Sequence, residues 1–157
     1  MDIILRELQP DDYLQVDALM LQMHSLHLQK RPDIFRDVPH PYSTEEYNQI
    51  LKDNQKLKIA ALIDDILVGL CIITLGNSMD CPVSISRPIA FIEDFCVDSH
   101  FRRHGVGSKL FNKAMEMAKK HGAERLELMV WSFNEDAIRF YEKIGLTPQN
   151  CVMEKYL

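Results

Sequence analysis

The sequence predicts a single mixed α/β domain, and three observations support this prediction. The chain has 157 residues, of which 46% are hydrophobic, which is enough for one buried core and too short for two full domains. Two apolar segments separated by a short acidic turn indicate a β-hairpin near the middle of the chain. From residue 88 onward, strand-like and helix-like segments alternate, as they do in α/β domains. We therefore expect residues 1–157 to form one domain.

The N-terminal part of the chain predicts a short strand and a long helix. Residues 3–5 form an apolar strand candidate. The acidic cluster that begins at Pro10 offers a start for a helix over residues 11–28. Three prolines interrupt the next segment, RPDIFRDVPHPY, which is typical of an irregular loop between helices.

A second helix and a hairpin follow this loop. Ser43 and Glu46 form a capping-box pattern, which predicts that a helix begins there. The apolar runs LKIAALI and ILVGLCIITL flank Asp64 and Asp65, and this pattern predicts two strands joined by a two-residue turn.

The C-terminal half predicts alternating strands and helices. A loop over residues 77–87 leads to a strand from Pro88 to Val97. The elements expected after it are a helix from Ser108 to Lys120 that Gly122 ends, a strand from Glu124 to Val130, a helix capped by Asn134 and stopped by Gly145, and a closing strand CVMEKYL.

Composition and charge argue against several classes of protein. The longest apolar run, Ile66–Leu75, is about half the roughly 20 residues that a membrane helix needs, and the acidic N-terminal segment differs from a secretory signal. We therefore expect a cytoplasmic protein without membrane contact. The four cysteines form no CxxC pair, so neither a metal site nor a disulfide framework is expected. The net charge of -5 argues against nucleic-acid binding and favours a cationic partner.

The stretch FRRHGVGSKL predicts an anion site between a strand and a helix. Gly105 and Gly107 allow tight backbone conformations that bring several N–H groups close to a ligand. The helix N-terminus adds about half a positive charge, and Arg102 and Arg103 add their own. The arrangement favours phosphate, although it also suits a simple turn with solvated arginines. A P-loop is excluded because GxxxxGK[ST] is absent, and a dinucleotide fingerprint is excluded because Leu110 replaces its third glycine.

Two motifs together resemble the GCN5-related N-acetyltransferase (GNAT) family. RRHGVG fits the family's pyrophosphate-binding signature, Q/R-x-x-G-x-G/A, and WSFNEDAIRFYEKIGL fits its second signature, N-x-x-A-x-x-F-Y-x-x-x-G-F/L. The strand order, the hairpin and the final MEKYL extend the resemblance over almost the whole chain. The resemblance implies a central mixed, mostly antiparallel sheet that splays between its fourth and fifth strands and has flanking helices. It also implies acetyl-CoA as the co-substrate, without a metal, and a homodimer.

The resemblance also implies which residues contact the coenzyme. The pantetheine arm is expected along the backbone of Phe95, Cys96 and Val97, where a backbone N–H would also serve as oxyanion donor. The pyrophosphate is expected at the glycine loop and the helical turn that follows. The residues of this segment are Arg102, Arg103, His104, Gly105, Val106, Gly107 and Ser108. Asn134 is expected both to cap its helix and to contact the coenzyme.

Tyr141 occupies the tyrosine position of the second signature, where the resemblance implies a phenol near the coenzyme sulfur. We expect Tyr141 to contact the coenzyme and to protonate the departing thiolate as general acid. The alternative is a tyrosine that packs in the core beside Phe140. The family transfers acetyl groups directly, so covalent catalysis by Cys96 is not expected.

Two carboxylates lie in the otherwise apolar strand before the glycine loop. Strand alternation predicts that Glu93 and Asp94 point to opposite faces of the sheet. The local text IEDFCV resembles that of diamine acetyltransferases, and in related enzymes an acid on this strand receives the proton of the amine. Glu93 is therefore the candidate general base, and both acids are expected to contact the acceptor. The alternative for Glu93 is an ion pair to a neighbouring strand or loop.

His24 and His27 lie one turn apart on the first predicted helix. Their spacing suits a metal, but no third ligand is evident. We expect them either to shape the acceptor pocket or to lie on plain surface.

These features predict an N-acetyltransferase that moves the acetyl group of acetyl-CoA directly to a primary amine on a small molecule such as a polyamine. One alternative acceptor is a protein N-terminus or lysine. A second alternative is a non-catalytic domain that binds acyl-CoA, against which the presence of both Tyr141 and Glu93 argues.

Overall fold

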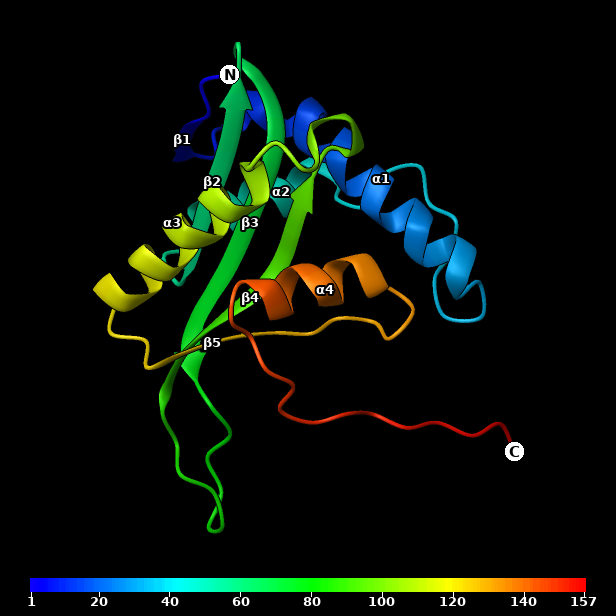
Figure 1. The fold of residues 1–157 in the computed structure, drawn as a ribbon, viewed down its shortest axis with the longest axis vertical. Helices are drawn as coiled ribbons and strands as arrows, with labels where there is room; N and C mark the ends of the chain where they lie inside the picture. The colour runs from blue at the N-terminus through cyan, green and yellow to red at the C-terminus, as the bar shows by residue number, and fades with distance from the viewer.

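The computed structural model describes residues 1–157 and contains one sheet of five strands in the order β1-β2-β3-β4-β5 (Figure 1). Neighbouring strands are antiparallel, except that β4 and β5 are parallel. The strands are β1 (Ile4–Glu7), β2 (Lys56–Ile63), β3 (Ile66–Asn77), β4 (Pro88–Val97) and β5 (Arg125–Leu128). The predicted α/β fold with a mixed, mostly antiparallel sheet is confirmed.

Four α-helices and two short 3-10 helices accompany the strands. They are η1 (Pro10–Asp12), α1 (Tyr13–Lys30), α2 (Thr44–Lys52), η2 (Ser99–Phe101), α3 (Val106–Lys120) and α4 (Glu135–Lys143). One buried cluster joins α1 and α2 to the sheet, and a second joins α3 to its other face, with α4 packed against that second cluster (Figure 1). None of the helices combines the length and the apolar character needed to span a bilayer.

Strand alternation determines which side chains enter which cluster. In β2, Leu57 and Ile59 face α3, whereas Ala60 and Leu62 face α1 and α2. The central strand β3 is buried on both faces over most of its length, which explains its nearly continuous apolar sequence. The strand β4, which carries the candidate site residues, is thus paired with a strand that is buried on both faces.

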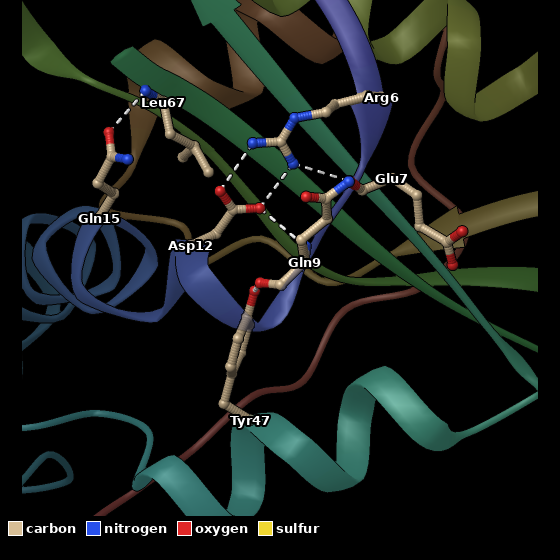
Figure 2. A network of polar contacts seen from close by, with 7 residues as sticks. All are labelled: Arg6, Glu7, Gln9, Asp12, Gln15, Tyr47 and Leu67. Atoms are coloured by element: carbon tan, nitrogen blue, oxygen red, sulfur yellow. Dashed lines mark hydrogen bonds and ion pairs between the residues drawn. The ribbon is translucent and has the colours of Figure 1, made fainter. Parts of the chain in front are cut away.

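A polar network fastens the N-terminal segment to the sheet and to α2 (Figure 2). The guanidinium of Arg6 on β1 donates two hydrogen bonds to the carboxylate of Asp12, at 2.7 and 2.8 Å. Asp12 also accepts from the backbone N–H of Gln9 at 2.8 Å, and the Tyr47 hydroxyl of α2 donates to the Gln9 carbonyl at 2.7 Å. The side chain of Gln15 on α1 accepts from the backbone N–H of Leu67 on β3 at 2.8 Å. These contacts fix α1 and α2 relative to the strands.

Local turn and cap signals are confirmed. Asp64 and Asp65 have φ angles of 48° and 63°, the left-handed backbone that a two-residue hairpin turn requires. In the predicted capping box, the Ser43 hydroxyl accepts from the Glu46 N–H at 3.2 Å and the Glu46 carboxylate accepts from the Ser43 N–H at 2.8 Å.

Helix boundaries differ slightly from the prediction. α1 begins at Tyr13 instead of residue 11, because the preceding three residues form η1. α3 begins at Val106 instead of Ser108, because Gly105 adopts a left-handed conformation and acts as the N-cap.

The predicted closing strand over residues 151–157 is wrong. The sheet ends at β5, and all seven residues are exposed and without regular structure. The segment has strand-forming side chains, but a strand forms only where a neighbour accepts and donates its hydrogen bonds. In Figure 1 this tail runs away from the sheet. It is tied to the end of α1 by an ion pair between Arg31 and Glu154 at 2.7 Å and by a hydrogen bond from Tyr156 to Asp33 at 2.5 Å.

Candidate active site

The sheet opens between β4 and β5. The two strands pair from Ile89 with Arg125 to Ile92 with Leu128, and β4 then continues to Val97 without β5 beside it. On its other side this part of β4 stays paired with β3, as in the pair Cys71 and Phe95. The predicted splay is therefore confirmed, and the backbone of Phe95, Cys96 and Val97 presents a free edge to the opening.

The glycine loop lies at the end of this free edge. Arg103 and Gly105 have φ angles of 65° and 83°, and Gly105 caps α3 without a side-chain hydrogen bond. The first N–H groups of α3 therefore have no partner within the helix. The Arg102 Nε donates to the Val97 carbonyl at 3.1 Å, and the His104 ring contacts the Arg102 carbonyl at 2.9 Å. These contacts place unpaired N–H groups and basic side chains beside the opening.

Gly107 is needed for helix packing. A β-carbon at this position would lie 3.2 Å from the Phe140 ring and 3.8 Å from a Val97 methyl group. The missing side chain thus lets α4 approach α3, so the space beside Gly107 is filled by Phe140.

Tyr141 packs against the free edge of β4. Its ring lies 6.1 Å from the Phe95 ring and 5.5 Å from the Phe140 ring, measured between centroids. Its hydroxyl makes no hydrogen bond within the chain, and burial raises the pKa of Tyr141, so the phenol stays protonated at neutral pH. Asn134 caps α4 as predicted, because its side-chain oxygen accepts from the Ala137 N–H at 3.3 Å.

A β-bulge brings both acids of β4 to one face of the sheet. Ile72 pairs with Asp94 and Ile73 with Ile92, so Glu93 is an extra residue in β4. Glu93 contacts Lys56 and Thr74, and Asp94 contacts Tyr42, all on the face that α1 and α2 cover. The prediction that Glu93 and Asp94 point to opposite faces is therefore wrong, because strict alternation fails at a bulge.

Glu93 is held in an ion pair. Its carboxylate accepts from the Lys56 Nζ and from the Thr74 hydroxyl, each at 2.6 Å. This contact is the alternative that the sequence left open for Glu93, an ion pair to a neighbouring strand.

Asp94 has a partner that sequence reasoning missed. The Tyr42 hydroxyl donates to the Asp94 Oδ2 at 2.5 Å. Asp94 is only 8% exposed, and burial raises its pKa, although the bond from Tyr42 opposes that shift. Tyr42 ends the proline-rich loop, where no periodic pattern indicates a contact with a distant strand.

An acidic recess lies beside the two carboxylates. It has a volume of about 330 Å³ and is lined by Tyr42, Glu46, Gln49, Ile50, Asp53, Lys56 and Glu93. Three carboxylates face one ammonium group, so the recess attracts cations.

The two histidines do not contact the carboxylates of β4. The His24 Nε2 lies 2.6 Å from the Arg36 carbonyl. His27 stacks on Phe35 with 5.1 Å between centroids and meets Phe133 edge-on at 5.7 Å, and burial lowers its pKa. The structure contains no group of three or more His, Cys, Asp or Glu side chains that could hold a metal ion.

Cys96 is a buried thiol. Its Sγ donates to the Leu19 carbonyl at 3.4 Å, and burial raises its pKa to about 12. A thiol in this state is a poor nucleophile, which agrees with the expectation of direct transfer.

The fold and the opened sheet agree with comparisons to known proteins. The chain belongs to the Acetyltransferase (GNAT) family, which matches residues 20–146. The crystal structure of a tetramutant of the BH1408 protein from Bacillus halodurans has a TM-score of 0.94 at 29% identity, covering 98% of this chain and 99% of that one.

Two curated relatives illustrate the range of proteins in the family that this chain resembles. The L-amino acid N-acetyltransferase AaaT of Escherichia coli is 30% identical over 152 residues, which cover 92% of this chain and 82% of that protein. Human N-alpha-acetyltransferase 30 is 27% identical over 133 residues, which cover 80% of this chain and 34% of that protein. The chain spans only 29% to 44% of the length of several curated relatives that it matches, the human protein among them.

Proposed function

We propose that the protein transfers the acetyl group of acetyl-CoA directly to a primary amine on a cationic small molecule. The observation that carries this proposal is the free edge of β4, which has the N-terminus of α3 at one end and two carboxylates at the other. Membership of the GNAT family supports acetyl-CoA as the donor.

The coenzyme would bind along this edge. Its pantetheine arm would pair with the backbone of Phe95, Cys96 and Val97, and its pyrophosphate would accept hydrogen bonds from the loop and helix start at residues 102–108. Asn134 caps the helix that carries Tyr141 and would contact the coenzyme from there. This orientation would bring the thioester toward Glu93 and Asp94.

The opening supplies the three groups that acetyl transfer needs. A carboxylate of β4 accepts the proton of the amine, and a backbone N–H of the free edge polarises the thioester carbonyl. Tyr141 then donates a proton to the departing thiolate. Its hydroxyl has no hydrogen-bond partner within the chain, which supports this role as general acid, and burial keeps the phenol protonated.

The acidic lining of the recess supports an acceptor that carries positive charge. Glu46, Asp53 and Glu93 would attract a substrate that carries a further positive charge, such as a polyamine. His24 and His27 would shape the acceptor pocket indirectly, because they contact Arg36 and Phe35 in the loop that carries Tyr42. The E. coli relative is named for L-amino acids and the human relative for N-alpha-acetylation, so both classes of acceptor belong in the test.

Product analysis tests the proposal. The protein is mixed with acetyl-CoA and one acceptor at a time, and the released thiol and the mass of the product are measured. We expect polyamines to give a higher kcat/KM than L-amino acids and than peptides with a free N-terminus or lysine. Preference for peptides would contradict a small-molecule acceptor. Binding of acetyl-CoA by calorimetry without any acetylated product would indicate a non-catalytic domain.

We also propose a homodimer in which the tail of one copy pairs with the sheet of the other. Val152, Met153, Tyr156 and Leu157 are between 78% and 119% exposed, and β5 has no strand on its outer side. Light scattering should give the mass of a dimer, and the double variant Val152→Asp, Tyr156→Asp should give a monomer. A monomeric wild type would contradict this proposal.

The four free cysteines support a cytoplasmic location.

A further inference from the structure

The two carboxylates of β4 differ in how completely their oxygens are engaged. In Glu93, Oε2 accepts from the Lys56 Nζ and Oε1 accepts from the Thr74 hydroxyl. The Lys56 Nζ also donates to the Thr74 oxygen at 2.7 Å, which closes a triangle of three side chains. Each oxygen of Glu93 keeps a second acceptor position, but the positive charge of Lys56 repels an incoming ammonium group.

Asp94 keeps one oxygen free. Its Oδ2 accepts from Tyr42, and its Oδ1 has no hydrogen-bond partner within the chain. The one side-chain oxygen or nitrogen that is both fully buried and without a hydrogen-bond partner is Oδ1 of Asp17. Because Oδ1 of Asp94 also has no partner, it must keep some contact with solvent. Asp94 therefore has an oxygen with no partner in the chain, whereas both oxygens of Glu93 already accept a hydrogen bond, one of them from a cation.

Tyr42 is itself held in place. The Tyr13 hydroxyl of α1 donates to the Tyr42 carbonyl at 2.8 Å, and Tyr42 packs against the cluster between α1, α2 and the sheet. Burial raises the pKa of the Tyr42 phenol, so this side chain remains a donor to the carboxylate. The loop after α1 thus delivers a fixed hydroxyl to a strand that lies far along the chain.

We propose that Asp94 accepts the proton of the acceptor amine and that Tyr42 is the residue that positions its carboxylate, while Glu93 is a fixed charge held by Lys56 and Thr74. The inference rests on the proposed acetyl transfer and replaces Glu93 as the candidate base. Asp94 is the second residue of β4 after Ile92, the last residue that pairs with β5, so Asp94 lies at the start of the edge along which the thioester would bind.

The proton and electron balance of this step is simple. The ammonium group gives one proton to Asp94, and the freed nitrogen lone pair attacks the thioester carbonyl. The C–N bond forms, the C–S bond breaks, and the thiolate leaves with the proton of Tyr141. The second proton of the nitrogen restores Tyr141, and the proton on Asp94 passes to solvent, so one proton is released for each acetyl group transferred.

The charges around Asp94 predict how its pKa responds to substitution. Burial raises this pKa, the bond from Tyr42 lowers it, the negative charge of Glu93 raises it and the positive charge of Lys56 lowers it. The other titratable neighbours are the thiols of Cys71 and Cys96, whose own pKa values burial raises, so both are neutral. Loss of the Tyr42 hydroxyl and loss of the Glu93 charge should therefore shift the pKa of Asp94 in opposite directions.

The test measures kcat/KM for a primary amine between pH 5 and 9.5 in four variants. Asp94→Asn should lose about 10²-fold or more at neutral pH. The acid limb of the profile is the pH range over which kcat/KM falls as Asp94 gains a proton. Tyr42→Phe should move this limb up by about one pH unit and recover activity above it, because the loss of a hydrogen bond to a charged group raises its pKa by about that amount. Glu93→Gln should lose less than about tenfold and move the limb down. The matched control is Tyr47→Phe, which removes the hydroxyl of another buried tyrosine on this face and should leave the limb in place.

The outcomes separate this inference from the proposed function. Nearly full activity of folded Asp94→Asn, or a loss in Tyr42→Phe that is the same at every pH, would overturn the roles of Asp94 and Tyr42 and leave acetyl transfer standing. An abolished limb in Glu93→Gln would return the role of base to Glu93. A wild type that acetylates no amine would overturn both proposals. Circular dichroism of each variant establishes that it is folded.

Discussion

The Arg102 side chain is hydrogen-bonded to Val97, the last residue of β4, along which the coenzyme would bind. Its Nε donates to the Val97 carbonyl at 3.1 Å, which leaves the other N–H groups of the guanidinium free. The glycine loop and the free edge of β4 are therefore one continuous surface, in which a basic side chain has a defined position.

Replacement of Arg102 should weaken coenzyme binding. Arg102→Ala removes both the charge and the tie to β4, so we expect acetyl-CoA to bind about 10-fold to 100-fold more weakly, the equivalent of one charge-assisted hydrogen bond. Isothermal calorimetry measures this change. The control is Arg125→Ala, which removes an exposed arginine of β5 and should leave the affinity unchanged. Equal affinities of the two variants would place the pyrophosphate elsewhere.

Gly105 should be intolerant of any side chain for reasons of backbone conformation alone. A β-carbon at this position meets nothing within 4 Å, but the φ angle of 83° is strained for other residues. Gly105→Ala should therefore lower the free energy of unfolding by about 1–2 kcal/mol. Gly76→Ala is the matched control, because Gly76 also has open space around it and its φ is not positive. Denaturation in urea compares them, and equal stabilities would contradict the argument.

Gly107 should be intolerant for a different reason, its contact with Phe140. Gly107→Ala places a methyl group about 3.2 Å from that ring, so the Phe140 side chain must move by a few tenths of an ångström, at a cost of about 1–3 kcal/mol. The double variant with Phe140→Leu should recover part of this loss, because the smaller side chain frees the space. Because Tyr141 is the next residue of α4, Gly107→Ala should also lower kcat. Additive effects of the two substitutions on unfolding would show that they do not interact.

Features with local signals could be predicted from the sequence. The capping box at Ser43 and the acidic hairpin turn each depend on a few adjacent residues, and the structure confirms them. The sequence also predicts that the aromatic pair Phe140 and Tyr141 lies on a helix, and both residues lie on α4.

Features that depend on distant partners could not be predicted. The contact between Tyr42 and Asp94 joins residues 52 positions apart, and neither residue lies in a pattern that indicates the other. The bulge at Glu93 depends on the register with β3, which a single strand sequence does not contain. The tail has a strand-like sequence, but whether it forms a strand depends on a neighbour outside the segment.

The ion pair of Arg6 and Asp12 should make stability depend on acid pH. The hydrogen bonds from Arg6, more than burial, determine the pKa of Asp12, which is lowered from its ordinary value of 3.8. A lowered pKa stabilises the fold above the pKa of the unfolded state and loses that effect as pH falls through the folded value. Asp12→Asn should therefore cost about 1–3 kcal/mol at pH 7 and progressively less below about pH 4.

Thermal unfolding of the wild type and Asp12→Asn between pH 7 and 3 measures this dependence. The control is Asp136→Asn, whose partner Arg139 and whose own side chain are both mostly exposed, so it should change the stability little at any pH. A difference between wild type and Asp12→Asn that stays constant across the range would show that Asp12 acts by shape and not by charge.

Removal of the Tyr141 hydroxyl should separate catalysis from packing. The ring of Tyr141 contacts Phe95 and Phe140, whereas its hydroxyl has no partner in the chain, so Tyr141→Phe removes the proton donor and keeps the contacts. We expect kcat to fall by about 10²–10⁴-fold, with the affinity for acetyl-CoA and the unfolding temperature nearly unchanged. An acetyl thioester whose thiol is more acidic than that of CoA needs less help from a general acid when the thiolate leaves, so the loss should be smaller with such a donor. Wild-type kcat in Tyr141→Phe, under conditions where chemistry limits the rate, would reduce Tyr141 to a residue that only packs against β4.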